Sequence, residues 1–321
     1  AVNGVAQTPY NWSGTLSSNG TTNVTLASSY TLSGASIYDI SAWVETVNGS
    51  VDCNNYNDTA KVEDLVSQLC GTYTIGGSSP DFVDFSEAAT VLNNAGITCP
   101  VVFSVRDGVY DGQVLLNNIT GNSIANSISF VGESGDSSLV TLRYNTSNSI
   151  LDYALKLENV KGITFRDIGI ERSSNTYALR IVNCDSVYMH SLVISGTRLE
   201  LDGCSNVTGR YLNMGDLYIS TNRCDSVYFS NSNINRLEIQ KRLDDFSLIS
   251  NNISILYAYG GNSDSITNGL IRSNNFGYYL ELSYGRGIVV DSNVMNLSSS
   301  IYLNYLKDVF VNHNTINYNY N

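Results

Sequence analysis

From residue 155 to the C-terminus, the chain repeats one pattern of apolar and polar positions. Each copy begins with a short alternating run, passes through a polar turn into a second run, and ends with an Asn/Ser turn and one more apolar residue. The copies start at Leu155, Leu179, Leu199, Leu217, Leu237, Leu256, Leu280 and Ile301. Their mean spacing of roughly 21 residues is typical of stacked structural repeats. Because one copy cannot bury its own apolar side, the pattern predicts a parallel β-helix whose coils cover one another.

Alternation within each copy assigns the inward-pointing residues, because successive side chains of a strand face opposite sides. One inward file contains Phe165, Met189, Gly209, Phe229, Leu248, Ile271, Val290 and Val311. A second contains Ile170, Ile194, Met214, Ile234, Ile253, Phe276, Met295 and Ile316. Stacked at the ~4.8 Å spacing of paired strands, the two files would form one continuous core.

An asparagine ladder is predicted at one corner of the coils. Asn251, Asn274, Asn293 and Asn314 take the same place in consecutive copies, directly after the second strand. Stacked carboxamides can hydrogen-bond from coil to coil there, while the backbone turns through the left-handed region. His313 is the last copy's counterpart of Ser292 and is therefore expected to be a turn residue.

Three of the six cysteines form a regular file. Cys184, Cys204 and Cys224 are 20 residues apart, and each precedes an inward Val by three positions. Cβ atoms of stacked residues lie near ~4.8 Å, which exceeds the ~3.8 Å typical of a disulfide. We expect a buried apolar file rather than a disulfide or a metal site. The pairing of Cys53, Cys70 and Cys99 stays open.

One helix is predicted ahead of the coils. Residues 82–95 place Phe82, Phe85, Ala88, Ala89 and Leu92 at helical spacing. Either Asp84 or Ser86 can cap its N-terminus. A short amphipathic helix here would cover the open end of the stack, whose edge strands otherwise invite association.

Residues 1–69 differ from the remainder. Short alternating runs separated by turn residues predict a β-sandwich. About 70 residues is short for a sandwich of ~100, so we expect a partial domain. The chain is accordingly expected to be a segment of a longer modular protein, with a domain of residues 1–69 followed by a β-helix of residues 70–321.

Composition narrows the classes of partner. Charged residues make up only 14% of the 321 residues, and the net charge is −12. An acidic surface repels phosphate backbones, so no nucleic-acid partner is expected. No apolar run approaches the ~20 residues needed to span a bilayer, so no membrane insertion is expected. Low charge with abundant Tyr favours a glycan or another cell-surface polymer, beside neighbouring domains of the same longer chain.

A family resemblance rests on the motif GTYTIGG…DFVDFSEAATVLN…PVVFSVRDGVYDGQV. It resembles the opening of pectin-lyase-like β-helix repeat proteins, especially large secreted surface proteins of bacteria. Over about residues 70–321, the resemblance implies an all-β, right-handed parallel β-helix with a short N-terminal capping helix, in an extracellular protein. Pectin methylesterases share the cap and a turn like GVYDG. Their catalytic signatures of the QDTL, DFIFG and GRPW types are absent from the sequence, so no catalytic residue is carried over.

A second resemblance concerns residues 1–69. The segment contains W-x-G-x-L at Trp12–Leu16, followed by NG…D-x-N…NDT. It is similar to the later strands of cell-adhesion-related Ig-like domains of bacteria. This resemblance implies an adhesion-type sandwich ahead of the β-helix.

The outward positions of the first strand suggest a ligand-binding face. They alternate aromatic and acidic residues, namely Tyr218, Glu238, Tyr257, Tyr259, Glu281 and Tyr302. Aromatic rings can stack on sugar C–H groups, and carboxylates accept hydrogen bonds from hydroxyls. The alternative is that these residues only decorate an exposed sheet, where aromatic side chains are favoured in any case.

Catalytic candidates are weaker. Lys156, Arg180 and Glu200 occupy neighbouring coils on the first strand, and Arg166, His190 and Arg210 do so on the second. A polysaccharide lyase needs a cation beside the uronate and a base, whereas a glycoside hydrolase needs two carboxylates. Glu200 and Asp202, two residues apart, fit the second requirement only loosely. Both trios are also explained as surface charge, so enzymatic activity stays open and no motif selects it.

One turn is rich in oxygen ligands. Asp52, Asn54 and Asp58 cluster in VDCNNYNDT and could bind calcium, although Asx turns alone explain such residues. No other cofactor is expected. The favoured function is an adhesin or stalk segment of a secreted or cell-surface protein, with or without glycan binding. The alternatives are a carbohydrate-active enzyme on the same fold and a trimeric receptor-binding fibre.

Overall fold

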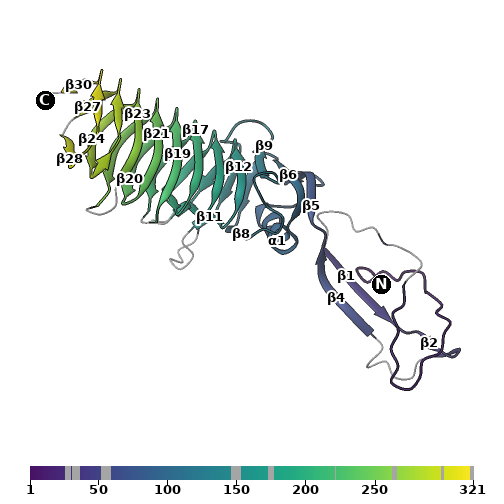
Figure 1. The fold of residues 1–321 in the computed structure, drawn as a ribbon. Coiled ribbons are helices and arrows are strands. Elements are labelled where there is room, and N and C mark those ends of the chain that lie inside the picture. The colour runs from purple at the N-terminus through teal and green to yellow at the C-terminus, as the bar shows by residue number, and fades with distance from the viewer. Residues whose placement is uncertain are drawn as a thin grey trace. The chain divides into compact units, whose positions relative to one another are not determined.

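The computed structural model describes residues 1–25, 30, 37–51, 59–145, 153–172, 177–220, 222–261, 266–297 and 300–318. The chain divides into two compact units, Ala1–Gln68 and Leu69–Asn321. Figure 1 shows the strands of the second unit stacked as successive rungs. This unit is a parallel β-solenoid, so the predicted all-β parallel β-helix is confirmed.

Two parallel sheets make up the described part of the solenoid. The second strand of each coil contributes to a 12-stranded sheet. Its strands are β5 (Leu69–Ile75), β6 (Ile97–Val105), β9 (Ile128–Gly132), β12 (Lys161–Arg166), β15 (Asp185–His190), β17 (Ser205–Arg210), β19 (Cys224–Ser230), β21 (Leu243–Ile249), β23 (Ile266–Arg272), β25 (Gly285–Arg286), β26 (Val289–Asp291) and β29 (Phe310–Asn312).

The third strand of one coil and the first strand of the next share a 14-stranded sheet. Its members are β7 (Gly108–Asp111), β8 (Val114–Asn117), β10 (Val140–Arg143), β11 (Tyr153–Glu158), β13 (Gly169–Glu171), β14 (Tyr177–Val182), β16 (Val193–Asp202), β18 (Asn213–Ile219), β20 (Asn233–Gln240), β22 (Asn252–Tyr259), β24 (Asn275–Ser283), β27 (Val294–Leu297), β28 (Ser300–Asn304) and β30 (Thr315–Tyr318). In β16, β18, β20, β22 and β24 these two strands are continuous, so each of these elements contributes to two faces of the solenoid.

Both predicted inward files are aligned by the strand register and buried, except in the last coil, where Val311 is 50% and Ile316 is 46% exposed. Phe165 is paired with Met189, and the file continues without interruption to Val311. The second file runs in the same way from Ile170 to Ile316. Gly209 is the member of the first file that has no side chain, and a Cβ there would lie 2.5 Å from the ring of Phe229. The missing side chain therefore makes room for the aromatic ring of the next coil.

The asparagine ladder is confirmed at the corner after the second strand. Asn251, Asn274 and Asn293 are each 1% exposed. The Asn274 side chain donates to Asn293 Oδ1 (3.1 Å) and to the carbonyl of Leu248 (2.7 Å), and its Oδ1 accepts from the backbone N–H of Asn251 (2.9 Å). The residue before each ladder Asn is left-handed, including His313 (φ 50°), which is a turn residue as predicted.

The capping helix α1 spans Phe85–Ala95 and begins three residues later than predicted. Asp84 is the N-cap, because its carboxylate accepts from the backbone N–H of Glu87 (2.9 Å). Glu87 in turn accepts from the backbone N–H of Val83 (2.7 Å), the residue before the N-cap, so the two carboxylates together satisfy backbone donors at the start of the helix. Phe82 therefore lies outside the helix, although it is buried (1% exposed). The helix packs against β5 and β8 at the start of the stack.

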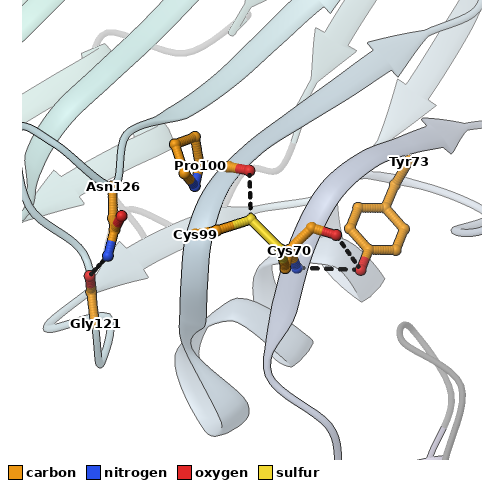
Figure 2. Close-up of a disulfide and its surroundings, with 6 residues drawn as sticks. All are labelled: Cys70, Tyr73, Cys99, Pro100, Gly121 and Asn126. Carbon is orange, nitrogen blue, oxygen red and sulfur yellow. Dashed lines mark hydrogen bonds between the residues drawn. A yellow bond between two sulfur atoms is a disulfide. The ribbon is translucent and has the colours of Figure 1, made fainter.

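Two kinds of cysteine are present among the described residues. Cys70 in β5 and Cys99 in β6 form a disulfide that closes a loop containing α1 (Figure 2). Figure 2 also shows the Tyr73 hydroxyl beside the backbone of Cys70. Cys184, Cys204 and Cys224 are free and buried, which confirms the apolar file. Burial raises the pKa of the Cys184 thiol to about 11, so this residue stays a neutral, unreactive thiol.

The unit Ala1–Gln68 contains two antiparallel pairs in its described part. One pair joins β1 (Ile37–Trp43) to β4 (Thr59–Val66), and the other joins β2 (Thr46–Val47) to β3 (Ser50–Val51). The adhesion-type sandwich stays a prediction. Across the described ranges of the chain, no helix is long and apolar enough to cross a membrane.

Candidate functional site

The predicted ligand-binding residues line up on one face of the 14-stranded sheet. Each pairs with the next in register, so the outward order from coil to coil is Tyr218, Glu238, Tyr257, Glu281 and Tyr302. We call this the tyrosine–glutamate file. Tyr259 lies two residues beyond Tyr257 on the same strand β22.

The glutamates of this file are held by their strand neighbours. Glu238 accepts hydrogen bonds from Arg236 (2.7 Å) and Gln240 (2.6 Å). Glu281 accepts from the hydroxyls of Tyr279 (2.9 Å) and Ser283 (3.2 Å). In each case the partners lie two residues before and two residues after the carboxylate. The carboxylates are therefore held in position, and an ionised carboxylate has about four acceptor positions, so acceptor capacity remains for a ligand.

Two rows of tyrosine rings flank the glutamate of β24. In the first row, the ring centroids of Tyr257 and Tyr279 are 4.7 Å apart, and those of Tyr279 and Tyr302 are 5.6 Å apart. The second row contains Tyr259, Tyr284 and Tyr305, with separations of 5.2 and 4.7 Å. These six residues are named here the tyrosine rows, and within each row the rings contact one another from coil to coil.

The exposed rings of this surface belong to both rows. Tyr302 is 46% exposed in the first row, and Tyr259 and Tyr305 are 49% and 75% exposed in the second. Upstream, Arg198 lies over the ring of Tyr218 at 5.9 Å, and Arg236 lies over that of Tyr257 at 5.0 Å. These two guanidinium groups therefore cover one face of the Tyr218 ring and one face of the Tyr257 ring. The rings open to a ligand therefore lie toward the C-terminal end of the file.

Two of the tyrosines have an unusual backbone. Tyr284 (φ 59°) and Tyr305 (φ 52°) are left-handed, a conformation that costs a bulky L-residue about 1–2 kcal/mol. Earlier coils place Asn159, Asn183 and Gly203 at this corner, which are residues that tolerate the conformation, and also Lys241 (φ 72°). The two Tyr rings nevertheless stack nearly parallel, at 9°.

Sequence reasoning missed Tyr279, Tyr284 and Tyr305. Tyr279 lies at a bend, where one extra residue shifts the register between β22 and β24. Tyr284 and Tyr305 lie at the corner after the strand, which alternation does not describe. The one available signal was the Tyr-for-Asn replacement at a repeated turn position.

Two hydroxyls of the tyrosine rows, those of Tyr279 and Tyr284, have a raised pKa. Desolvation, together with the hydrogen bond to Glu281, raises the pKa of Tyr279 to about 12. Desolvation also raises the pKa of Tyr284. Tyr279 and Tyr284 thus keep neutral hydroxyl groups, which can both donate and accept hydrogen bonds.

The first catalytic trio is adjacent in register but already paired. Arg180 lies between Lys156 and Glu200 on the outer face. Arg180 forms a salt bridge with Glu200 (2.5 Å), and Lys156 forms one with Glu158 (3.0 Å). Glu200 is only 5% exposed. A uronate would have to displace these carboxylates, so the arrangement does not present free cations to a substrate.

The second trio is also adjacent, on the 12-stranded sheet. His190 lies between Arg166 and Arg210 in register. Arg166 pairs with Asp167 at 3.0 Å. The imidazole Nδ1 of His190 lies 2.9 Å from the Ser191 hydroxyl, and its ring stacks on Tyr188. The register thus brings the three predicted residues together on neighbouring strands.

Metal binding was predicted at Asp52, Asn54 and Asp58, which lie outside the described residues. Within the part of the chain that the structure describes, no group of three or more His, Cys, Asp or Glu side chains could hold a metal ion. The calcium hypothesis therefore stays a prediction.

The comparisons with known proteins found similarity only to solved structures. No protein-family model and no curated protein matches the chain. The chain is similar to the deglycosylated pectin methylesterase of Aspergillus niger, with 15% identity over 78% of this chain and 87% of that chain and a TM-score of 0.41. It is also similar to the pectin methylesterase from carrot, with 13% identity over 79% and 85% and a TM-score of 0.44. A third similar structure is ORF18 of Geobacillus virus E2, with 12% identity over 71% and 55% and a TM-score of 0.38. Identities of 12–15% at these TM-scores carry no information about activity.

Proposed function

We propose that this chain is a segment of a secreted or cell-surface modular protein, an adhesin or stalk whose solenoid binds glycans through the tyrosine rows. The observation that carries the proposal is the pair of rows with Glu281 held between them. Exposed rings can pack on the apolar faces of sugars, and the carboxylate accepts hydroxyl hydrogen bonds. A repeating surface of this kind suits a repeating polymer.

The disulfide supports an extracellular location. Disulfides such as Cys70–Cys99 persist in oxidising compartments and are rare in the cytosol. The low content of charged residues, 14%, also suits neutral polymers better than polyelectrolytes.

A glycan array on the intact chain, followed by calorimetric titration of its best ligand, tests the proposal. The variant Tyr259→Ala/Tyr302→Ala removes one exposed ring from each row. It should weaken binding about tenfold or more, as expected when a binding hot spot is lost. The matched control Tyr188→Ala/Tyr228→Ala removes two tyrosines from the other sheet and should leave the affinity unchanged.

Two results would contradict this proposal. An array without any bound glycan would remove its basis, and an equal loss in the test and control variants would show that the rows are not the site.

The two alternatives have direct assays. Incubation with pectin and alginate should produce no absorbance from unsaturated uronates, because Lys156 and Arg180 are engaged by carboxylates. Production of that absorbance would favour a polysaccharide lyase. Light scattering distinguishes the remaining alternative, since a receptor-binding fibre of this fold would be a trimer.

A further inference from the structure

A groove of about 340 Å³ opens on the face formed by the third strands of the coils, and none of the predicted ligand-binding residues line it. It crosses the first halves of β18, β20, β22 and β24, which precede the bend that leads to the tyrosine–glutamate file. Its lining includes Asn213, Asn233, Asn252, Asn275, Ser254 and Gly277. The four asparagines are paired in register from coil to coil, so the same chemical group repeats along the solenoid axis.

The chemistry of this groove is uncharged and bifunctional. Each carboxamide carries two donors and one acceptor oxygen. Asn252 Nδ2 donates to Asn233 Oδ1 (2.8 Å), and Asn275 Oδ1 accepts from Asn296 (2.8 Å). These bonds use only part of that capacity and orient the amides of the row. All four asparagine side chains are exposed. No Lys, Arg, Asp or Glu is among the described residues that line the groove.

The backbone around the groove is already satisfied. β20 is paired with β18 and with β22, and β22 is paired with β24, so these strands have no free edge. A peptide cannot add to the sheet as a further strand here, because strand addition needs an unpaired edge. A ligand must therefore be recognised by the side-chain amides. Sugar hydroxyls match such groups, since they also both donate and accept.

Gly277 keeps the groove open, although no packing contact requires a glycine at this position. A Cβ built there would meet only Ser254, at 3.4 Å or more, which is ordinary contact. Its φ lies outside the left-handed region, so an L-residue would fit the backbone as well. By contrast, Gly209 and Gly269 leave space that the rings of Phe229 and Phe246 fill. The small residue at 277 thus preserves space rather than a turn or a close contact.

We propose that this groove is a second binding site, for a linear, uncharged, hydroxyl-rich glycan that lies along the solenoid axis. The coils repeat at ~4.8 Å, close to the length of one sugar unit in an extended chain, so successive sugars can meet successive asparagines. Polyanions such as uronates or nucleic acids gain nothing in a groove without cations, on a chain of net charge −12. The site goes beyond the tyrosine rows and does not depend on them.

The test titrates the intact chain with cellohexaose and mannohexaose as neutral probes and with polygalacturonate as the anionic probe. The side-chain NH₂ resonances of Asn233 and Asn252 should shift with at least one neutral probe and not with polygalacturonate. Gly277→Leu, which fills the groove, and Asn233→Ala/Asn252→Ala, which removes two amides, should each weaken that binding about tenfold. Circular dichroism checks that both variants stay folded.

The two sites are distinguished by reciprocal variants. Tyr259→Ala/Tyr302→Ala should leave the groove-dependent shifts intact, so failure of the tyrosine rows as a site would not affect this result. Neutral probes that leave both Asn resonances unmoved would overturn the second site. So would an unchanged affinity in Gly277→Leu, equal binding of polygalacturonate, or a peptide that competes with the neutral probe for the same resonances.

Discussion

Replacing Asn274 by Leu should destabilise the solenoid far more than the same change at the end of the asparagine ladder. Leu has a similar volume, so the substitution removes hydrogen bonds without opening a large cavity. The Asn251 backbone N–H loses its acceptor, Oδ1 at 2.9 Å, and the Leu248 carbonyl loses a donor, Nδ2 at 2.7 Å. Both contacts are buried, and water cannot replace the lost partners.

The magnitude follows from these two orphaned groups. A buried polar group that loses its partner costs about 1–3 kcal/mol, so the pair costs about 2–6 kcal/mol. Burial of the Leu side chain offsets about 1.5–3 kcal/mol of this. We expect a net loss of about 2 kcal/mol, which is a large fraction of the ~5–15 kcal/mol that stabilises a typical domain.

Urea unfolding of Asn274→Leu and Asn314→Leu, side by side, measures the difference. Asn314 is half-buried, so water can reach the groups that it leaves, and we expect a loss below about 1 kcal/mol there. Hydrogen exchange adds a local readout, because the Asn251 amide should lose protection only in Asn274→Leu. Equal losses in the two variants, or an Asn251 amide that stays protected, would refute the ladder's assigned role.

Three further predictions concern other parts of the solenoid. Replacing Cys70 and Cys99 by Ala should lower the free energy of unfolding by about 3.5 kcal/mol, because the disulfide closes a loop with a sequence separation of 29; an unchanged urea midpoint would contradict this. Gly209→Ala should lower the free energy of unfolding by about 1–3 kcal/mol, because the Cβ of Ala would lie 2.5 Å from the Phe229 ring. Thermal unfolding measures this loss, and an unchanged stability would mean that the ring moves freely. Tyr279 should ionise only near pH 12, because desolvation and a hydrogen bond to a carboxylate raise its pKa to about 12. Its contribution to stability should be complete below the ordinary tyrosine pKa of ~10 and should be lost as pH rises through the raised pKa. ¹³C-tyrosine NMR can follow this ionisation.

Much of the fold was readable in the sequence because the alternation of strand side chains is local. Phe165 and Val311 are separated by most of the solenoid, yet every step between them keeps the predicted register. The corner ladder was readable for a related reason. A corner position whose side chain must pair buried backbone groups restricts the residue type, so Asn251, Asn274, Asn293 and Asn314 recur at one place in the last four coils. The N-cap Asp84 illustrates the remaining local uncertainty, since Ser86 competed with it and only the hydrogen bond to Glu87 decides between them.

Only part of the candidate sites could be predicted from the sequence. Tyr257, Glu281 and Tyr302 were predicted as neighbours and are adjacent in register. The companion ring of Tyr279 was not predicted, because a one-residue bulge decides whether residue 278 or 279 faces Ile255.

The sequence by itself determined that the coils stack, which residues point inward, and which polar residues repeat along the outside, because these follow from period-two alternation and a regular repeat length. Only the tertiary structure decided what happens where that period breaks. Bends and corners placed Tyr284 against Tyr305, paired Cys70 with Cys99 across a helix, and left space beside Gly277. Such contacts join residues from different coils, so they depend on the exact length of each turn, which local propensity does not encode.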